Sequence, residues 1–215
     1  MSDDKSAPSI TRMIESLQLS ASDDFWSIRA KAIHEYANLE QALFQMFSRL
    51  SGMDMNTAGL IFFRIVSTRA RNAIIEDLYR KKFGDELNLF RNSLIKSLGS
   101  IDNDRNKVVH WHAVTLIETR DDGATSQDIR LEKPQYWEFN ETSASFTRSD
   151  MVGFTAICKF FSYICGMFAM LMLPVPTSAH NMHEDDARTW RDIFRRSIVY
   201  PPPVDHPIFQ TLRAP

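Results

Sequence analysis

Arg105, Asn106 and His110 are the residues of this chain whose types and spacing are best suited to chemistry. An arginine presents a planar fork of donors that can bind a phosphate, and a histidine gains or loses a proton near neutral pH. Four residues separate Arg105 from His110, and Asn106 adds a neutral donor beside the arginine. These residue types are the minimum needed to cleave a phosphodiester without a metal ion.

The spacing alone is common, and the same chain provides a control. Arg29 and His34 are also separated by four residues, in a segment predicted to be the middle of a helix. Five helical steps place two side chains about 140° apart around the axis. We therefore expect Arg29 to be a solvated face residue and His34 to flank the apolar stripe, with no shared site.

Arg105 and His110 differ from this control in their local context. Gly99-Ser100 is expected to interrupt the helical pattern, and Asp102, Asn103 or Asp104 can cap a new helix that begins close to Arg105. Free backbone N–H groups in the first turn of a helix favour a bound phosphate. The sequence therefore predicts a phosphate-binding helix start at Arg105.

With its Arg-Asn step, two β-branched residues and a histidine, this segment resembles the HEPN superfamily (higher eukaryote and prokaryote nucleotide-binding domains). The HEPN signature is an arginine, a polar residue and a histidine after four to six intervening residues. The resemblance covers about residues 22 to 175 in architecture and is specific in Arg105, Asn106 and His110.

The resemblance implies a metal-independent endoribonuclease that needs no cofactor and acts as a homodimer, with the two motifs facing each other. His110 would be the general base or acid, Arg105 would stabilise the pentavalent phosphorane, and Asn106 would orient the phosphate or Arg105. The product would carry a 2′,3′-cyclic phosphate, and DNA would be spared. Family analogy adds a toxin or defence setting with an antitoxin or regulator. The alternative is a catalytically inert HEPN-like module that binds a nucleotide or a partner protein.

His112 stands where toxins of one HEPN subfamily often carry a tyrosine, two residues after the motif histidine. It also keeps a permitted spacing from Arg105, so it is a second candidate for the catalytic histidine. If the helix continued, His110 and His112 would point about 200° apart; if the chain became extended at Trp111, they would share a face. We favour His110.

The apolar periodicity predicts a mainly α fold, a HEPN-like bundle of four to five helices with a small antiparallel β insertion. We expect a helix capped at Ser22 or Asp23, a helix over 57–83 bent near Ser67, a third helix capped by Asp85, and an apolar helix from Ser149 or Asp150 to Leu173. The expected divisions are a polar lead over 1–21, the bundle over 22–175 with its β insertion at about 113–140, and a basic helix with a Pro-rich tail over 176–215.

The β insertion is predicted from β-branched residues over 114–119, the turn signal Asp121-Asp122-Gly123, an alternating pattern over 129–132 and aromatic residues over 136–139. The last helix is expected over 184–197 and is basic, through Arg188, Arg191, Arg195 and Arg196 beside Trp190. A solvated helix explains these arginines, and contact with an RNA backbone is the alternative. The tail from Tyr200 is expected to be extended or disordered.

Composition limits the partners of the protein. The net charge of -2 gives no overall attraction to nucleic acid, so RNA binding would need a local basic patch. The apolar run over 160–175 is shorter than the roughly twenty residues that span a bilayer, which favours a core helix and no membrane association. Cys158 and Cys165 read as reduced, buried residues, and the first twenty residues carry no signal-peptide pattern. We therefore expect a cytoplasmic protein. His180 and His183 lack the other ligands of a structural metal site, and no metal is expected.

Overall fold

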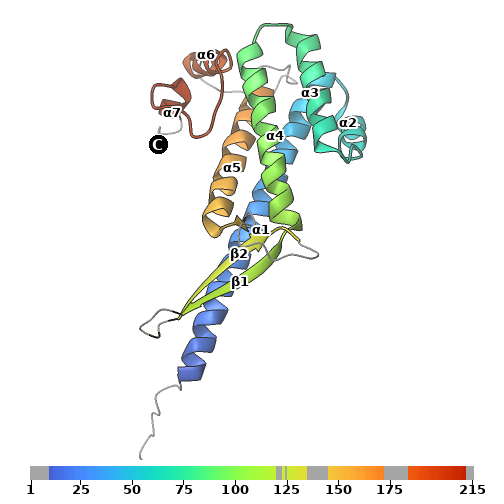
Figure 1. The fold of residues 1–215 in the computed structure, drawn as a ribbon. Helices are drawn as coiled ribbons and strands as arrows, with labels where there is room; N and C mark the ends of the chain where they lie inside the picture. Colours follow the sequence, from blue (N-terminus) through green and yellow to red (C-terminus); the bar gives the residue numbers. More distant parts are fainter. Residues whose placement is uncertain (1–9, 120–122, 124, 135–144, 172–183, 212–215) are drawn as a thin grey trace, which may run out of the picture. The chain divides into compact units, whose positions relative to one another are not determined.

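The computed structural model describes residues 10–119, 123, 125–134, 145–171 and 184–211, with side chains from Ser22 onward except at positions 118, 184 and 210. Contacts group the chain into two compact units. The first unit comprises Met1–Ile33 and Asn106–Gly153, and the second comprises His34–Arg105 and Phe154–Pro215. The expected divisions at 1–21, 22–175 and 176–215 follow chain order, whereas each of these units combines segments distant in sequence. The fold is mainly helical with a small antiparallel sheet, as the sequence predicted (Figure 1).

In the first unit, a three-stranded sheet follows the end of helix α4 (Asn88–His110). Strands β1 (His112–Thr119) and β2 (Thr125–Glu132) form an antiparallel hairpin, with His112 opposite Glu132 and Thr119 opposite Thr125 (Figure 1). The short β3 (Ser145–Phe146) pairs with β2 and places Phe146 opposite Leu131, and both side chains are buried. Gly123 has a φ of +78°, which suits the predicted turn. The expected aromatic strand over 136–139 lies outside the described residues.

Helix α1 (Ile10–Ser51) contributes to both units. It is continuous, so the expected helix start at Ser22 or Asp23 is wrong. Neither glycine nor proline interrupts residues 10–51, and the weaker helix formers Ser22, Asp23 and Asp24 lower the helix propensity without ending the helix. Apolar residues at helical spacing along α1 are buried, among them Phe25, Tyr36, Leu39, Met46 and Leu50.

In the second unit, the predicted helix over 57–83 is two helices, α2 (Met55–Phe62) and α3 (Thr68–Phe83). Asp54 caps α2 by accepting from the backbone N–H groups of Asn56 and Thr57, and Ser67 caps α3 by accepting from Ala70. Gly84 ends α3 at a φ of +58°, a conformation that glycine adopts readily.

Helix α5 (Arg148–Leu171) also contributes to both units. Thr147 and Asp150 cap it reciprocally, because the Thr147 N–H donates to the Asp150 carboxylate and the Asp150 N–H donates to the Thr147 hydroxyl. Within the described residues, α5 is the one helix long and apolar enough to cross a bilayer by length and composition. However, 56% of its most apolar 18-residue stretch is buried inside the protein, as in a core helix.

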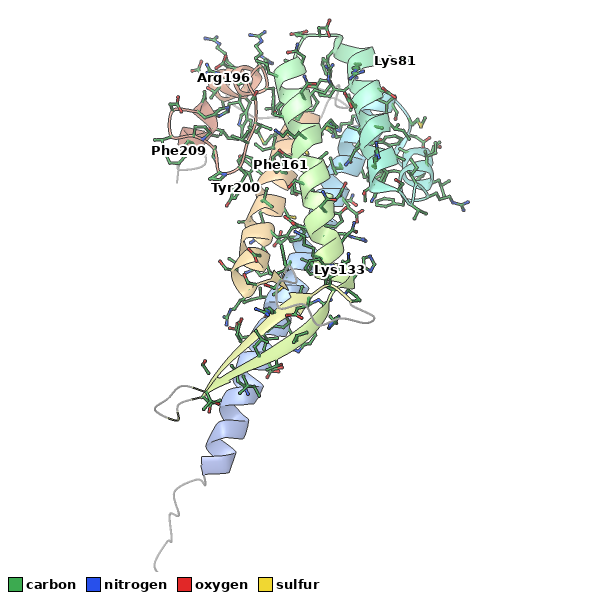
Figure 2. The ribbon with its side chains drawn as sticks, in the orientation of Figure 1. Lys81, Lys133, Phe161, Arg196, Tyr200 and Phe209 are labelled. Atoms are coloured by element: carbon green, nitrogen blue, oxygen red, sulfur yellow. The ribbon has the colours of Figure 1, made fainter. Side chains whose placement is uncertain are left out.

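The core of the second unit is aromatic. Phe168 of α5 packs its ring against Tyr79, Phe90 and Phe194, with ring centroids 5.2, 5.2 and 5.1 Å away. Residues 194–211, which follow helix α6 (Glu184–Ile193), fold back onto this unit and include the short helix α7 (Pro207–Thr211). The expectation of an extended or disordered tail is wrong over 200–211, because Ile208 is fully buried and the Tyr200 ring packs against Phe160. Figure 2 labels Tyr200 and Phe209 in this segment.

Candidate functional site

Arg105 lies in the interior of α4, so the expected helix start at this residue is wrong. The helix runs through Gly99 without a break. Its buried stripe, Leu94, Leu98, Ile101 and Val108, keeps helical spacing on both sides of the glycine. A glycine inside a helix costs about 1 kcal/mol, which packing of this stripe can offset. Free N–H groups of a first turn therefore do not contribute to a phosphate site at Arg105.

Helix α4 ends at His110, which settles the path of the backbone between His110 and His112. A bend at Trp111 follows, and His112 is the first residue of β1, so the chain does become extended there. Both histidine side chains are exposed. Asn106 is exposed as well, and it lies one helical turn before His110 on the same face of α4. A solvent-open amide and a solvent-open imidazole thus share one face of the first unit.

Arg29 holds the end of α4, which corrects the expectation that it is a solvated face residue. Its Nε donates to the carbonyl oxygen of Val108 at 2.9 Å, and its Nη2 donates to those of Val109 and Trp111 at 3.2 and 3.0 Å. The last carbonyls of a helix have no partner within the helix, and a cation is favourable at this negative end of the helix dipole. Burial lowers the pKa of the Arg29 guanidinium from its usual value. Arg29 therefore fixes where the helix stops and where His110 is presented.

Lys107 and Trp111 form the flank of this helix end. The Lys107 ammonium lies 6.0 Å from the centre of the Trp111 ring and 5.1 Å from that of Phe146. Both distances permit a cation–π attraction. The lysine thus connects the helix end to β3.

Arg105 belongs to the second unit, where its guanidinium lies 5.6 Å from the centre of the Tyr36 ring. The Tyr36 hydroxyl donates to Asp102 Oδ1 at 2.9 Å, and Asn72 Nδ2 donates to Asp102 Oδ2 at 2.9 Å. The other face of this network is apolar, because Tyr36 stacks on Phe154. Burial, followed by the charges of Asp102 and Glu40, raises the pKa of Tyr36, so its hydroxyl stays protonated as a donor.

Arg71 forms an ion pair and a cation–π contact within the second unit. Its Nη2 lies 2.6 Å from Glu40 Oε1, and its guanidinium covers the Phe62 ring at 5.2 Å. Arg64 and Arg69 are exposed. The sequence analysis did not identify Tyr36, Asn72 and Asp102 as a connected polar network. A signal for this network was present in the sequence, because Asp102 is an acidic residue directly after Ile101 of the apolar stripe of α4.

The basic residues of the C-terminal helix face solvent. Arg188, Arg191, Arg195 and Arg196 are exposed, and Arg196 pairs with Asp192 at 2.9 Å, whereas Trp190 is buried against Tyr163 and Phe194. α6 ends at Ile193, four residues before its expected end. Trp190 is thus a core residue and not a stacking platform, and contact of the arginines with RNA stays a prediction.

No group of three or more potential metal ligands occurs within the part of the chain that the structure describes. His180 and His183 lie outside that part. Cys158 and Cys165 are free and buried, as predicted. Burial raises the pKa of each thiol to about 12, so neither supplies a thiolate at neutral pH.

No protein-family model, no curated protein and no solved structure matches this chain. The HEPN resemblance therefore stays a prediction that rests on Arg105, Asn106, His110 and the helical architecture.

Proposed function

We propose that this protein is a metal-independent endoribonuclease that uses the exposed end of α4. The observation that carries the proposal is the shared solvent-open face of Asn106 and His110, one helical turn apart. An enzyme that cuts a long polymer needs its proton carrier at an accessible surface, and His110 meets this requirement. The position of the helix end is fixed by the three hydrogen bonds from Arg29.

The reaction would proceed by attack of the ribose 2′-oxygen on the adjacent phosphorus. His110 would remove the proton from the 2′-OH or give one to the departing 5′-oxygen. The products would be a 2′,3′-cyclic phosphate and a free 5′-hydroxyl. Asn106 would donate to a phosphate oxygen, and the HEPN resemblance assigns Arg105 to the negative charge that grows on the phosphorane. His112 is also exposed and follows Trp111 in the chain, and it is the second candidate for a proton carrier.

The proposal includes the partners that the resemblance implies. These are RNA, a second copy with the motifs at the interface, and an antitoxin or regulator in a toxin or defence setting. The exposed Arg188, Arg191 and Arg195 are candidates for contact with the RNA backbone.

A catalytically inert HEPN-like module is the second candidate, and the surroundings of Arg105 favour it. Its guanidinium lies over the Tyr36 ring, beside the network of Asp102 and Asn72. An arginine in such a position can serve the stability of the helix bundle without touching a substrate. The module would then bind a nucleotide or a partner protein without cleaving RNA.

The two candidates are separated by cleavage of RNA in excess chelator. We expect the wild-type protein to cut RNA, and His110→Ala to lower the rate by about 10²- to 10⁴-fold, the usual contribution of a general acid or base. Arg105→Ala and Asn106→Ala should also lower it, and Arg105→Lys shows whether a positive charge alone is sufficient. The matched control is His34→Ala, because His34 is an exposed helical histidine at the same spacing from an arginine.

Equal cleavage by the wild-type protein, His110→Ala and His112→Ala would contradict the proposal, and so would cleavage that stops in chelator. If His112→Ala abolishes cleavage while His110→Ala does not, the role of proton carrier moves to His112. Folding of each variant is checked by circular dichroism, so that a lost activity is not a lost fold.

A further inference from the structure

Trp26 of α1 is a large aromatic residue that stays exposed in the first unit. It is 47% exposed, although two neighbours hold its ring in place. The Phe25 ring meets it edge-on, with centroids 5.3 Å apart and an angle of 84° between the planes, and the Arg29 guanidinium lies 5.4 Å from its centre. Phe25 is buried, so it anchors the indole to the core. The indole is therefore fixed in position and open to solvent at the same time.

Arg29 connects this ring to the end of α4. The guanidinium that lies over the Trp26 ring also donates to the carbonyl oxygens of Val109 and Trp111, at 3.2 and 3.0 Å. These two carbonyl groups belong to the residues on either side of His110 in the chain. One side chain thus bridges the exposed indole and the helix end that presents His110, and all of these residues belong to the first unit.

Cations and aromatic rings lie together around this helix end. Besides the pair of Arg29 and Trp26, the Lys107 ammonium lies 6.0 Å from the centre of the Trp111 ring. Surfaces that bind single-stranded nucleic acid combine these two kinds of side chain, because bases stack on the rings and cations attract the backbone. The end of α4 therefore has the composition of such a surface.

We propose that Trp26 is a base-stacking platform for an unpaired nucleotide of the RNA substrate. Every base has a flat π-face, so an indole can hold a base whatever the sequence. In a duplex the bases are stacked on one another, whereas an unpaired nucleotide can turn its base onto an aromatic ring. The inference rests on the proposed ribonuclease function in taking RNA as the ligand, and it deepens that function by naming single-stranded RNA as the substrate class.

Acidic residues beside the ring indicate which part of the nucleotide it holds. Asp23 and Asp24 precede Trp26 in α1 and are exposed, and Asp24 pairs with Arg148. Negative charge at this position disfavours a phosphate, whereas a neutral base on the indole is little affected by it. The base therefore lies on Trp26, and the adjacent phosphodiester lies toward the end of α4.

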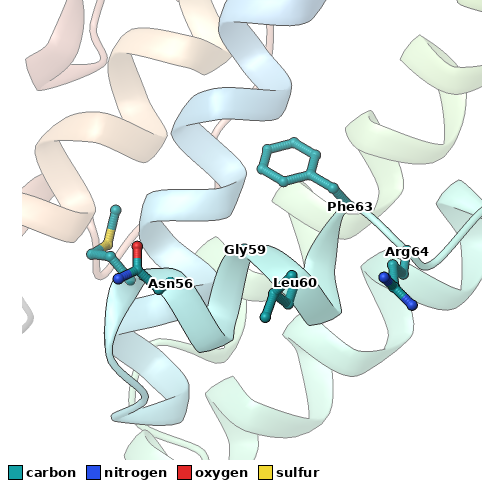
Figure 3. A pocket seen from close by; sticks show the side chains of 6 residues that line it. Asn56, Gly59, Leu60, Phe63 and Arg64 are labelled. Atoms are coloured by element: carbon teal, nitrogen blue, oxygen red, sulfur yellow. The ribbon is translucent and has the colours of Figure 1, made fainter.

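Phe63 provides a matched control, because it is an exposed aromatic residue with different surroundings. It is 54% exposed and belongs to the second unit. A shallow groove on α2 (Figure 3) is lined by Met55, Asn56, Gly59, Leu60, Phe63 and Arg64. Phe63→Ala thus removes an exposed ring from a largely apolar groove and leaves the first unit unchanged.

The test measures binding separately from cleavage, on the full chain. Fluorescence anisotropy with labelled RNA whose 2′-oxygens are methylated reports binding alone, because this RNA lacks the attacking hydroxyl. We expect the single strand to bind at least about tenfold more tightly than a duplex of the same sequence. Trp26→Ala should weaken binding of the single strand by about 5- to 150-fold, the usual contribution of one stacked base.

Two further variants distinguish stacking from apolar contact. Trp26→Leu should bind as weakly as Trp26→Ala, because leucine is apolar but has no π-face, whereas Trp26→Phe should retain most of the affinity. Phe63→Ala should bind like the wild type. The single strand should also quench part of the tryptophan fluorescence of the wild-type protein, and this part should be absent in Trp26→Phe. Circular dichroism checks that each variant is folded.

The inference is overturned if the wild-type protein, Trp26→Ala and Trp26→Leu bind the single strand equally, if the duplex binds as tightly, or if the wild type binds neither. Unchanged RNA binding with altered sedimentation of Trp26→Ala would assign the ring to a protein contact instead. Cleavage of unmodified RNA is assayed alongside, to separate this inference from the proposed function. Binding that depends on Trp26 without cleavage supports the platform and contradicts the ribonuclease, whereas cleavage and binding that are both independent of Trp26 contradict only the platform.

Discussion

Replacing Asp102 with alanine tests how the second unit holds Tyr36 beneath Arg105. The carboxylate accepts hydrogen bonds from the Tyr36 hydroxyl and the Asn72 amide, both at 2.9 Å. Tyr36 and Asn72 are buried, with exposures of 7% and 9%, so water replaces the lost acceptor poorly. A hydrogen bond to a charged group contributes about 1.5–3 kcal/mol. Because the network is partly open to water, we expect Asp102→Ala to lower the free energy of unfolding by about 3 kcal/mol.

For a chain of this size, 1 kcal/mol corresponds to a shift in Tm of about 2–4 °C, so Asp102→Ala should lower Tm by roughly 6–12 °C. The assay is urea and thermal unfolding followed by circular dichroism. Asn103→Ala, at an exposed neighbouring position on the same helix, is the control and should stay within about 0.5 kcal/mol of the wild type. The double variant Tyr36→Phe, Asp102→Ala should lose less than the sum of the two single variants, by about 1 kcal/mol or more. Strict additivity, or a loss below about 0.5 kcal/mol for Asp102→Ala, would refute the reasoning.

Two other variants and two treatments have expected outcomes of defined sign. Arg29→Ala removes three hydrogen bonds to the end of α4, so we expect faster amide hydrogen exchange around Trp111 and a loss of about 2 kcal/mol; unchanged exchange would contradict the capping role. The hydroxyl of Tyr79 is buried without a hydrogen-bond partner among the described residues, so Tyr79→Phe should leave stability equal or raise it, and a loss above about 1 kcal/mol would argue against this. Burial raises the pKa of the Tyr79 hydroxyl above its usual value near 10. The free energy of unfolding should therefore be insensitive to this group below about pH 10 and fall as pH rises further, because the hydroxyl ionises more easily in the unfolded chain. Titration of tyrosinate absorbance should show a fraction that ionises only on unfolding. Cys158 and Cys165 should resist alkylation at pH 8 until the protein is unfolded in urea, because the pKa of each is raised to about 12, and rapid labelling of the native protein would show that they are accessible.

The helices were predictable wherever one apolar stripe continued through a segment. Phe90, Leu94 and Leu98 lie on one face of α4 at helical spacing, and all three are buried. The same stripe was the signal that α4 continues past Gly99, because Ile101 and Val108 keep its phase. Gly99 does not end the helix, because the cost of a glycine is small beside the packing of a whole helix face. Ser22 and Asp23 likewise do not start a new helix in α1, since a residue that can cap a helix does not by itself end the preceding one.

The sequence could name candidate residues for the site but not their surroundings. The sequence located the helix end near Trp111 through the β-branched residues that follow it. It could not show that Arg29, about eighty residues earlier, supplies the hydrogen bonds that close that end. Nor could it show that Asp102 serves Tyr36 and Asn72, because these pairings join three helices. Contacts between segments distant in sequence depend on the packing of the helices, which local patterns do not encode.

The central claim is tested most directly with a DNA oligonucleotide that contains a single ribonucleotide. In excess chelator, we expect the wild-type protein to cut this strand only on the 3′ side of the ribonucleotide, and mass spectrometry should find a 2′,3′-cyclic phosphate on one product and a 5′-hydroxyl on the other. His110→Ala should give no product above the buffer blank, and the all-DNA strand should stay intact. Cleavage of the all-DNA strand, equal cleavage by both His110→Ala and His112→Ala, or no cleavage by the wild-type protein would contradict the proposed ribonuclease.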